Sequence, residues 1–181
     1  MKNNYSFKNM KQRCENYQPF IKWVGGKRNL LKQILPLLSV EFNAYHEPFL
    51  GGGALFFELF SMGKLKNKKA YLSNTNAELI NAYEVVKTNP LVLIEELLRF
   101  KQDHSKNFYY EARSWDRRSD FEKMCPIKRA ARFIYLNKTC YNGLHRVNQK
   151  GFFNVPIGNY KDPTICDSET ILACSYALQW P

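Results

Sequence analysis

Three consecutive glycines close the segment Glu-Pro-Phe-Leu-Gly-Gly-Gly at residues 47–53, and this run constrains the fold more than any other feature of the chain. Residues 44–50 read as a buried strand that leads into the glycines, and residues 54–65 have apolar side chains at helical spacing. A second strand is predicted at residues 68–74. Strand, glycine turn, helix and strand form a βαβ unit, which implies an α/β fold with a parallel, right-handed, doubly wound sheet.

The remaining pattern is mainly helical. Helices are predicted at residues 28–38, 77–87, 90–100 and 167–179, with Pro90 as a helix start and Asp167 as an N-cap. From residue 90 to 138 the chain is helical and basic. Residues 145–155 read as a β-hairpin that turns near Lys150 and Gly151.

Positive charge is concentrated in two blocks of the chain, whose formal net charge is +11. Residues 1–38 carry eight lysines and arginines against one acid, and residues 100–150 carry twelve against five. Two basic blocks indicate a polyanionic partner, of which nucleic acid is the commonest, although a soluble basic protein without such a partner has the same composition. The five cysteines and three histidines have no metal-ligand spacing, and the N-terminus has no apolar signal segment, so we expect a cytoplasmic protein without a metal.

A glycine turn at the carboxyl end of a parallel strand is where doubly wound folds bind nucleotides. The usual pattern places an acid about 20 residues further on, to hold a ribose hydroxyl. Asn74 stands 21 residues after Gly53, so the position fits but the charge is missing. The spacing from Gly53 to Asn74 is compatible with a dinucleotide or with S-adenosylmethionine. It is also compatible with no ligand, because a purely structural tight turn can have the same glycines. The glycine pair at 25–26 fails the phosphate-loop pattern, because Ile21 and Arg28 occupy positions that require Gly and Ser or Thr.

Four segments in order resemble the Dam-type (D12 class) family of DNA adenine-N6 methyltransferases: KWVGGKR (22–28), EPFLGGGALFF (47–57), LSNTNAELINAY (72–83) and LNKTCYNGLHRVNQKGFFNVPIGNY (136–160). The resemblance implies S-adenosylmethionine-dependent, site-specific methylation of double-stranded DNA, as in restriction–modification. It divides the chain into a polar N-terminal extension (1–18), the first part of a cofactor-binding domain (19–89), a helical target-recognition insertion with its hairpin (90–178) and a short end (179–181). The fold would be a partial, Rossmann-like sheet.

The resemblance also assigns cofactor residues. It places Trp23 and Lys27 at S-adenosylmethionine, with Lys27 near the cofactor carboxylate. The strand end and the glycines line the same pocket, namely Glu47, Pro48, Phe49, Gly51 and Gly53. Asn74 stands where the family has Asp, and we expect it to weaken cofactor binding because it cannot form charge-assisted hydrogen bonds.

DNA contacts are assigned to the segment that begins at Tyr141. Arg146 is the strongest candidate for base reading, since arginine binds guanine O6 and N7 bidentately. Tyr141 can stack in the gap that a flipped adenine leaves, and Asn142, Leu144 and Pro156 complete this set. A basic helix surface, made of Lys128, Arg129, Arg132 and Lys138, is expected to face phosphates. Arg113, Asp116 and Arg117 are expected to form an internal ion-pair network instead.

The family's catalytic Asp-Pro-Pro-Tyr tetrapeptide is absent, because no two of the eight prolines are adjacent. We therefore expect a truncated chain that is inactive alone, since no acid accepts hydrogen bonds from the target amine. Two alternatives stay open: half of an enzyme that a second polypeptide completes, and a non-catalytic DNA-binding module. A dinucleotide oxidoreductase is a more distant alternative, against which the recognition segment argues.

Overall fold

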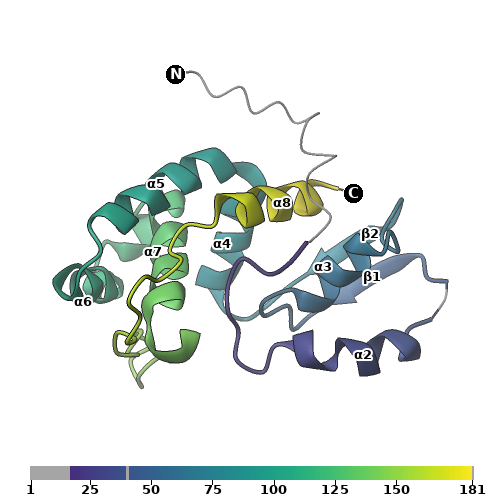
Figure 1. Cartoon of the computed structure of the whole chain (residues 1–181), viewed down its shortest axis with the longest axis horizontal. Coiled ribbons are helices and arrows are strands. Elements are labelled where there is room, and N and C mark those ends of the chain that lie inside the picture. The colour runs from purple at the N-terminus through teal and green to yellow at the C-terminus, as the bar shows by residue number, and fades with distance from the viewer. Residues whose placement is uncertain (1–16, 40, 181) are drawn as a thin grey trace.

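The structure is a computed structural model that describes residues 17–39 and 41–180. Figure 1 shows a small α/β part beside a larger helical part, with the C-terminal helix lying over both. Apart from its last two residues, the predicted N-terminal extension lies outside the described residues. Within the described ranges, no helix combines the length and apolar character needed to cross a membrane.

The α/β part confirms the predicted strand, glycine turn, helix and strand. Strand β1 (Ala44–Glu47) and strand β2 (Lys69–Leu72) pair in parallel, with Ala44 opposite Lys69 and Glu47 opposite Leu72, and helix α3 (Ala54–Ser61) connects them. This mixed α/β arrangement with a short two-stranded parallel sheet is consistent with part of a methyltransferase fold.

The helix predicted at 28–38 is divided into three short elements: η1 (Lys27–Leu30), α2 (Leu31–Ile34) and η2 (Leu35–Leu37). Pro36 lies in the last of these. Because proline has no N–H to donate, a regular α-helical ladder cannot continue through it.

Five longer helices form the second part, and local sequence explains where each of them begins. Asn76, Ser105 and Asp167 act as N-caps, each accepting a hydrogen bond from the amide three residues on. Pro90 and Pro126 occupy first-turn positions, where a missing N–H costs nothing. The elements are α4 (Ala77–Thr88), α5 (Pro90–Gln102), α6 (Lys106–Ser114), α7 (Pro126–Thr139) and α8 (Ser168–Gln179), with short turns η3 (Trp115–Arg117), η4 (Phe121–Lys123) and η5 (Tyr141–Gly143).

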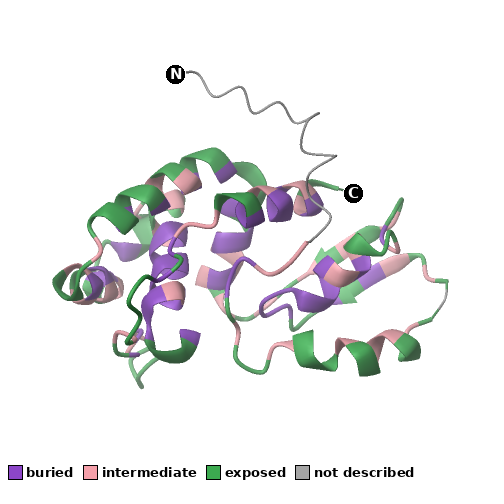
Figure 2. Cartoon of the chain, in the orientation of Figure 1, coloured by how far each residue is buried: buried purple, intermediate pink, exposed green. Residues whose placement is uncertain are grey.

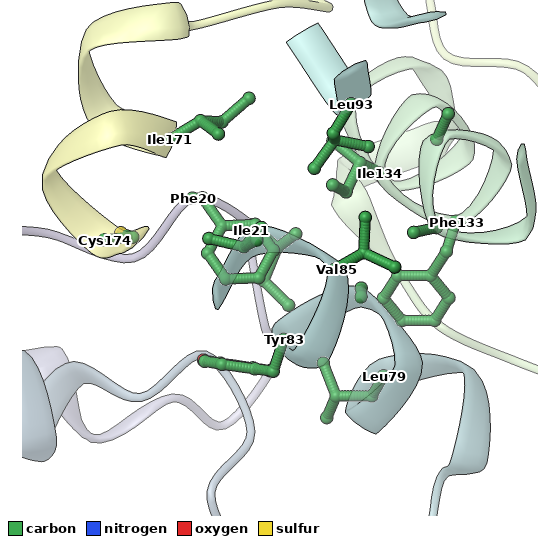
Figure 3. Close-up of a cluster of buried hydrophobic side chains, with 14 of the residues drawn as sticks. Phe20, Ile21, Leu79, Tyr83, Val85, Leu93, Phe133, Ile134, Ile171 and Cys174 are labelled. Atoms are coloured by element: carbon green, nitrogen blue, oxygen red, sulfur yellow. The ribbon is translucent and has the colours of Figure 1, made fainter. Parts of the chain in front are cut away.

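The hydrophobic core is continuous across both parts (Figure 2). Helix α4 packs against α7 and α8. Figure 3 shows Phe20 and Ile21, from the segment before η1, beside Leu79 and Tyr83 of α4 and Ile134 of α7. The predicted division at residue 89 therefore falls inside one core, and it stays a prediction as a domain boundary.

The predicted β-hairpin at residues 145–155 is not confirmed as a regular element. In the described part of the chain this segment forms a single antiparallel bridge, between Val147 and Phe153, and a second isolated bridge joins Cys140 to Ile157. Gly151 lies at the turn with a φ of +80°. The segment is thus an irregular loop that doubles back on itself.

Candidate functional site

The glycine turn lies at the carboxyl end of β1, and aromatic side chains of this chain pack against it. Gly51 and Gly53 have φ angles of +53° and +72°. A Cβ added at Gly51 would lie 2.8 Å from Cδ1 of Trp23, and one at Gly53 would lie 2.7 Å from the Tyr83 hydroxyl oxygen. That hydroxyl donates a hydrogen bond to the Gly51 carbonyl oxygen over 3.2 Å. The turn therefore requires glycine both for its backbone conformation and for close aromatic packing.

A buried carboxylate stands next to this turn. The Glu47 side chain is only 4% exposed, and the Lys27 ammonium lies 3.0 Å from its Oε1. The Tyr45 hydroxyl donates to Oε2 over 2.8 Å, and the Lys27 ammonium also donates to the Phe49 carbonyl oxygen over 2.6 Å. Burial and then the Glu47 charge raise the pKa of Tyr45, so the phenol stays protonated as the donor. Both carboxylate oxygens are thus satisfied, and Lys27 is fixed against the strand end.

A cavity of about 350 Å³ opens beside this cluster. Its lining includes Lys27, Glu47, Pro48 and the exposed Phe49, together with apolar side chains from β1, α3 and the segment after η2. A larger hollow of about 450 Å³ lies between β2, α4 and the end of α8, and no predicted site residue lines it. Because the smaller cavity contains the charged and exposed groups of the strand end, we regard it as the candidate ligand site.

The end of β2 is organised by two asparagines. Asn74 Oδ1 accepts a hydrogen bond from the backbone amide of Asn76 over 2.9 Å. Asn76 in turn caps α4, with its Oδ1 accepting from the Leu79 amide over 3.0 Å. The Asn74 side chain therefore shapes the turn before α4, a role that an aspartate oxygen could also fill.

The recognition segment, defined as residues 140–158, exposes most of the side chains assigned to DNA. Tyr141 is 53% exposed, and Asn142 is exposed in the left-handed conformation with a φ of +54°. The Tyr141 amide donates to the Pro156 carbonyl oxygen over 2.9 Å, so these two distant residues are neighbours. Arg146 Nε donates to Asn154 Oδ1 over 2.8 Å, which holds the exposed arginine against the returning chain.

The glycine turn and the recognition segment meet at one junction. The His145 ring stacks on Trp23, with centroids 5.6 Å apart and an interplanar angle of 21°. The Asn137 side chain accepts from the Lys22 amide and donates to the carbonyl oxygens of Lys22 and Gly143, at 2.8, 2.7 and 3.1 Å. Burial and then the nearby Arg132 charge lower the pKa of His145, which favours the neutral ring.

The family model described as D12 class N6 adenine-specific DNA methyltransferase matches residues 23–179, which include the glycine turn, the junction and the recognition segment. The chain belongs to this family.

Proteins similar to this chain include methyltransferases from bacteria and archaea. The type II methyltransferase M1.LlaDCHI of Lactococcus lactis subsp. cremoris is 47% identical over 163 residues, covering 90% of this chain and 55% of the relative. The type II methyltransferase M.MjaIII of Methanocaldococcus jannaschii is 45% identical, with coverage of 90% and 59%. A DNA adenine methylase of Vibrio cholerae is 35% identical, with coverage of 83% and 51%. The chain thus spans about half the length of the curated relatives it matches.

The structure brings together most of the residues that the D12 resemblance assigned. Lys27, Glu47, Phe49 and the glycines gather at the end of β1, with Trp23 over the turn. Tyr141, Leu144, Arg146 and Pro156 lie on the recognition segment, where Leu144 is half-buried and the other three are exposed. The ligand-binding roles of all these residues stay predictions.

Arg132 is a correction to the phosphate-facing helix surface. Its side chain is only 3% exposed and pairs with Asp116 over 3.0 Å. It also donates to the carbonyl oxygens of Ala112 and Arg113, over 2.6 and 2.8 Å. One of the four basic residues predicted to face phosphates is therefore buried, and Asp116 of η3 neutralises its charge.

The other basic side chains of α7 have different surroundings. Arg129 forms an ion pair with Glu78 of α4. Lys138 is half-buried, and burial lowers its pKa while Asp167 opposes that shift. Lys128 is exposed over the Trp115 ring. Of the four, Lys128 remains the most accessible to a phosphate.

The ion-pair network expected around η3 is confirmed in part. Asp116 pairs with Arg117 as well as with Arg132, over 2.6 and 3.0 Å. Asp116 Oδ2 also accepts from the Phe153 amide over 2.7 Å. Arg113 instead donates to the Val155 carbonyl oxygen over 3.2 Å. This polar cluster fixes the backbone of the recognition segment on either side of Asn154.

Three residues of the site, Asn76, Asn137 and His145, carry roles that sequence reasoning did not assign. Asn76 had a usable signal, since an asparagine before a helical pattern predicts an N-cap. Asn137 lies in the last turn of α7 without a capping pattern and His145 is an isolated histidine, so neither has a local signal. Their partners are distant in the sequence, and only the folded chain reveals them.

Proposed function

We propose that this chain is the cofactor-binding and DNA-recognising part of an adenine-N6 DNA methyltransferase that acts on double-stranded DNA. The observation that carries the proposal is the junction at which Trp23, packed over the glycine turn, stacks on His145 beside the exposed Arg146. This junction joins the glycine turn, which follows the strand that lines the candidate ligand pocket, to the candidate base-reading segment. In this proposal the sheet is part of a doubly wound, Rossmann-like sheet and the region 90–178 is the inserted recognition region. The names of the relatives favour a modification enzyme of a type II restriction–modification system.

The residues at the end of β1 fit S-adenosylmethionine. Lys27 is 30% exposed beside the cavity and offers a cation to a carboxylate, while the glycines keep the turn free of side chains of their own. Phe49, which is 75% exposed at the same cavity, offers an aromatic surface. When bound, S-adenosylmethionine supplies an electrophilic methyl group. Asn74 in place of an aspartate is proposed to weaken this binding, which a cofactor titration of Asn74→Asp tests.

Methyl transfer from S-adenosylmethionine to duplex DNA by the 181-residue chain is expected to be undetectable. The 181 residues contain no Asp-Pro-Pro-Tyr, so no such acid accepts the hydrogen bonds of the adenine amine and orients it. Labelled methyl incorporation into a mixed-sequence duplex measures this. Activity is expected to return when a second polypeptide that carries the tetrapeptide and its strands is mixed with the chain. Incorporation by the chain alone would show that another group takes the place of the acid.

Arg146→Ala is expected to reduce discrimination among duplex sequences by about 1–3 kcal/mol, the usual worth of a bidentate contact to a base. The measurement is the spread of affinities across a library of short duplexes at fixed salt. Lys150→Ala is the matched control, because it removes one exposed positive charge from the same segment. That control is expected to weaken all duplexes alike.

If Arg146→Ala also weakened every duplex equally, Arg146 would be a phosphate contact and not a base reader. Duplex binding by a chain that does not bind S-adenosylmethionine would favour the non-catalytic DNA-binding module.

A further inference from the structure

We propose that His145 is a positioning residue that holds Trp23 and Arg146 in a fixed relation, so that cofactor binding and base reading depend on one side chain. The proposal rests on the proposed function of the two ends of the site. His145 is not among the residues assigned to either ligand, and its ring lies between them.

On one side, His145 supports the glycine turn through Trp23. The two rings are nearly parallel, at 21°, with centroids 5.6 Å apart. Trp23 also contacts the turn itself, since a Cβ at Gly51 would lie 2.8 Å from Cδ1 of the indole. Phe133 of α7 also stacks on the indole, with centroids 6.4 Å apart. Removal of the imidazole would therefore remove one of the packing contacts that hold the indole against the glycines.

On a second side, His145 contacts the carboxyl end of β2. The side-chain amide nitrogen of Asn76, Nδ2, lies 3.2 Å from Nε2 and 3.4 Å from Nδ1 of the His145 ring. The same asparagine caps α4, and its backbone amide is bound by Asn74. The ring thus contacts Trp23, which packs on the glycine turn after β1, and Asn76, the N-cap of α4 that follows β2.

On the third side, His145 is anchored in the recognition segment. Phe153 packs on it with centroids 5.7 Å apart, and the Asp116 carboxylate fixes the Phe153 amide. Arg146 follows directly in the chain and is held to Asn154, the residue after Phe153. A shift of the imidazole is therefore transmitted to the backbone that presents Arg146.

The junction has a second attachment that does not involve His145. Asn137 binds the backbone of Lys22 and of Gly143, each within two residues of the stacked pair. This attachment keeps the two segments in contact when the imidazole is removed. His145→Ala should therefore remain folded, which makes the positioning role separable from a purely structural one.

The test combines a measurement without ligand and one with ligands, on the 181-residue chain. Native-state hydrogen exchange is measured at the amides of Leu50 and Gly53 in the turn and of Tyr141 and Leu144 in the recognition segment, all of which donate backbone hydrogen bonds. His145→Ala is expected to raise exchange at both sets by roughly two- to tenfold, the range set by the loss of one aromatic stack. S-adenosylmethionine affinity and discrimination among duplexes are expected to fall together by a similar factor.

Two variants provide the comparison. His145→Phe keeps a stacking ring but loses the polar partner of Asn76, and it should retain protection of the turn amides. His104→Ala removes a histidine that contacts Tyr135 in the helical part, and it should leave both sets of amides unchanged.

An increase in exchange confined to one of the two sets in His145→Ala would overturn the proposal, as would no increase in either. A chain that bound neither S-adenosylmethionine nor duplex DNA would instead contradict the proposed function, while hydrogen exchange would still decide whether His145 joins the two segments.

Discussion

Asp116→Ala is expected to lower the free energy of unfolding by about 3 kcal/mol. Breaking a buried ion pair typically costs about 3–5 kcal/mol, because it leaves a buried charge without its partner. The lower end applies here, since Arg132 would keep the carbonyl oxygens of Ala112 and Arg113 as acceptors. The Phe153 amide would lose its acceptor as well. Equilibrium urea denaturation measures the change.

Two comparisons identify the cause of that loss. Asp116→Ala combined with Arg132→Met removes both charges and is expected to recover part of the stability, because no unpaired charge remains. Asp120→Ala breaks the exposed pair with Arg118, in which both side chains are more than half exposed, and should leave the urea midpoint almost unchanged. A loss at Asp116 as small as that at Asp120 would show that water replaces the carboxylate.

Gly53→Ala is expected to destabilise the protein by about 2–5 kcal/mol. The left-handed conformation at φ +72° costs a non-glycine residue about 1–2 kcal/mol. The added Cβ would lie 2.7 Å from the Tyr83 hydroxyl oxygen and 3.1 Å from Cε2 of Phe57, and overpacking of this kind adds about 1–3 kcal/mol. Thermal and urea unfolding both report the effect.

Gly63 is a close control for this substitution. Its φ is +69°, and a Cβ added there meets nothing within 4 Å. Gly63→Ala is therefore expected to show only the backbone strain of about 1–2 kcal/mol. The difference between the two variants measures the packing contribution at Gly53, and equal losses would contradict the crowding that the Tyr83 contact implies.

The fold was predictable where a local pattern determines the structure. The glycine turn, each strand beside α3 and the capped helix after Asp167 are each marked by a pattern within a short stretch of sequence. Pro36 also carried a local signal, although the helical prediction at 28–38 ran through it. The irregular course of the recognition segment was harder to predict, because its hydrogen bonds to η3 and α6 involve residues outside the segment that predicted a hairpin.

The candidate site was predictable by resemblance, but its internal contacts were not. Arg132 has the same spacing as the other basic residues of α7, and its burial depends on Asp116, a residue 16 positions earlier on another element. His145 reads as an isolated histidine until the fold places it on Trp23. In both cases the deciding partner is distant in the sequence, so no window of a few residues contains the information.

If the recognition segment carries target preference, as proposed, the hydrogen bonds between Asn137 and Lys22, which join residues 115 positions apart, also limit how that preference can be exchanged between relatives. A graft of residues 90–178 from a relative would replace Asn137 and His145 but leave in place their partners Lys22, Trp23 and Asn76. The grafted region would lack part of its contact surface, because Lys22 and Trp23 precede the glycine turn in the sequence. Under the proposed function, a chimera that keeps these contacts would have to exchange residues 20–23, Asn76 and α4 along with the recognition region, since three separated stretches of the chain meet at the junction.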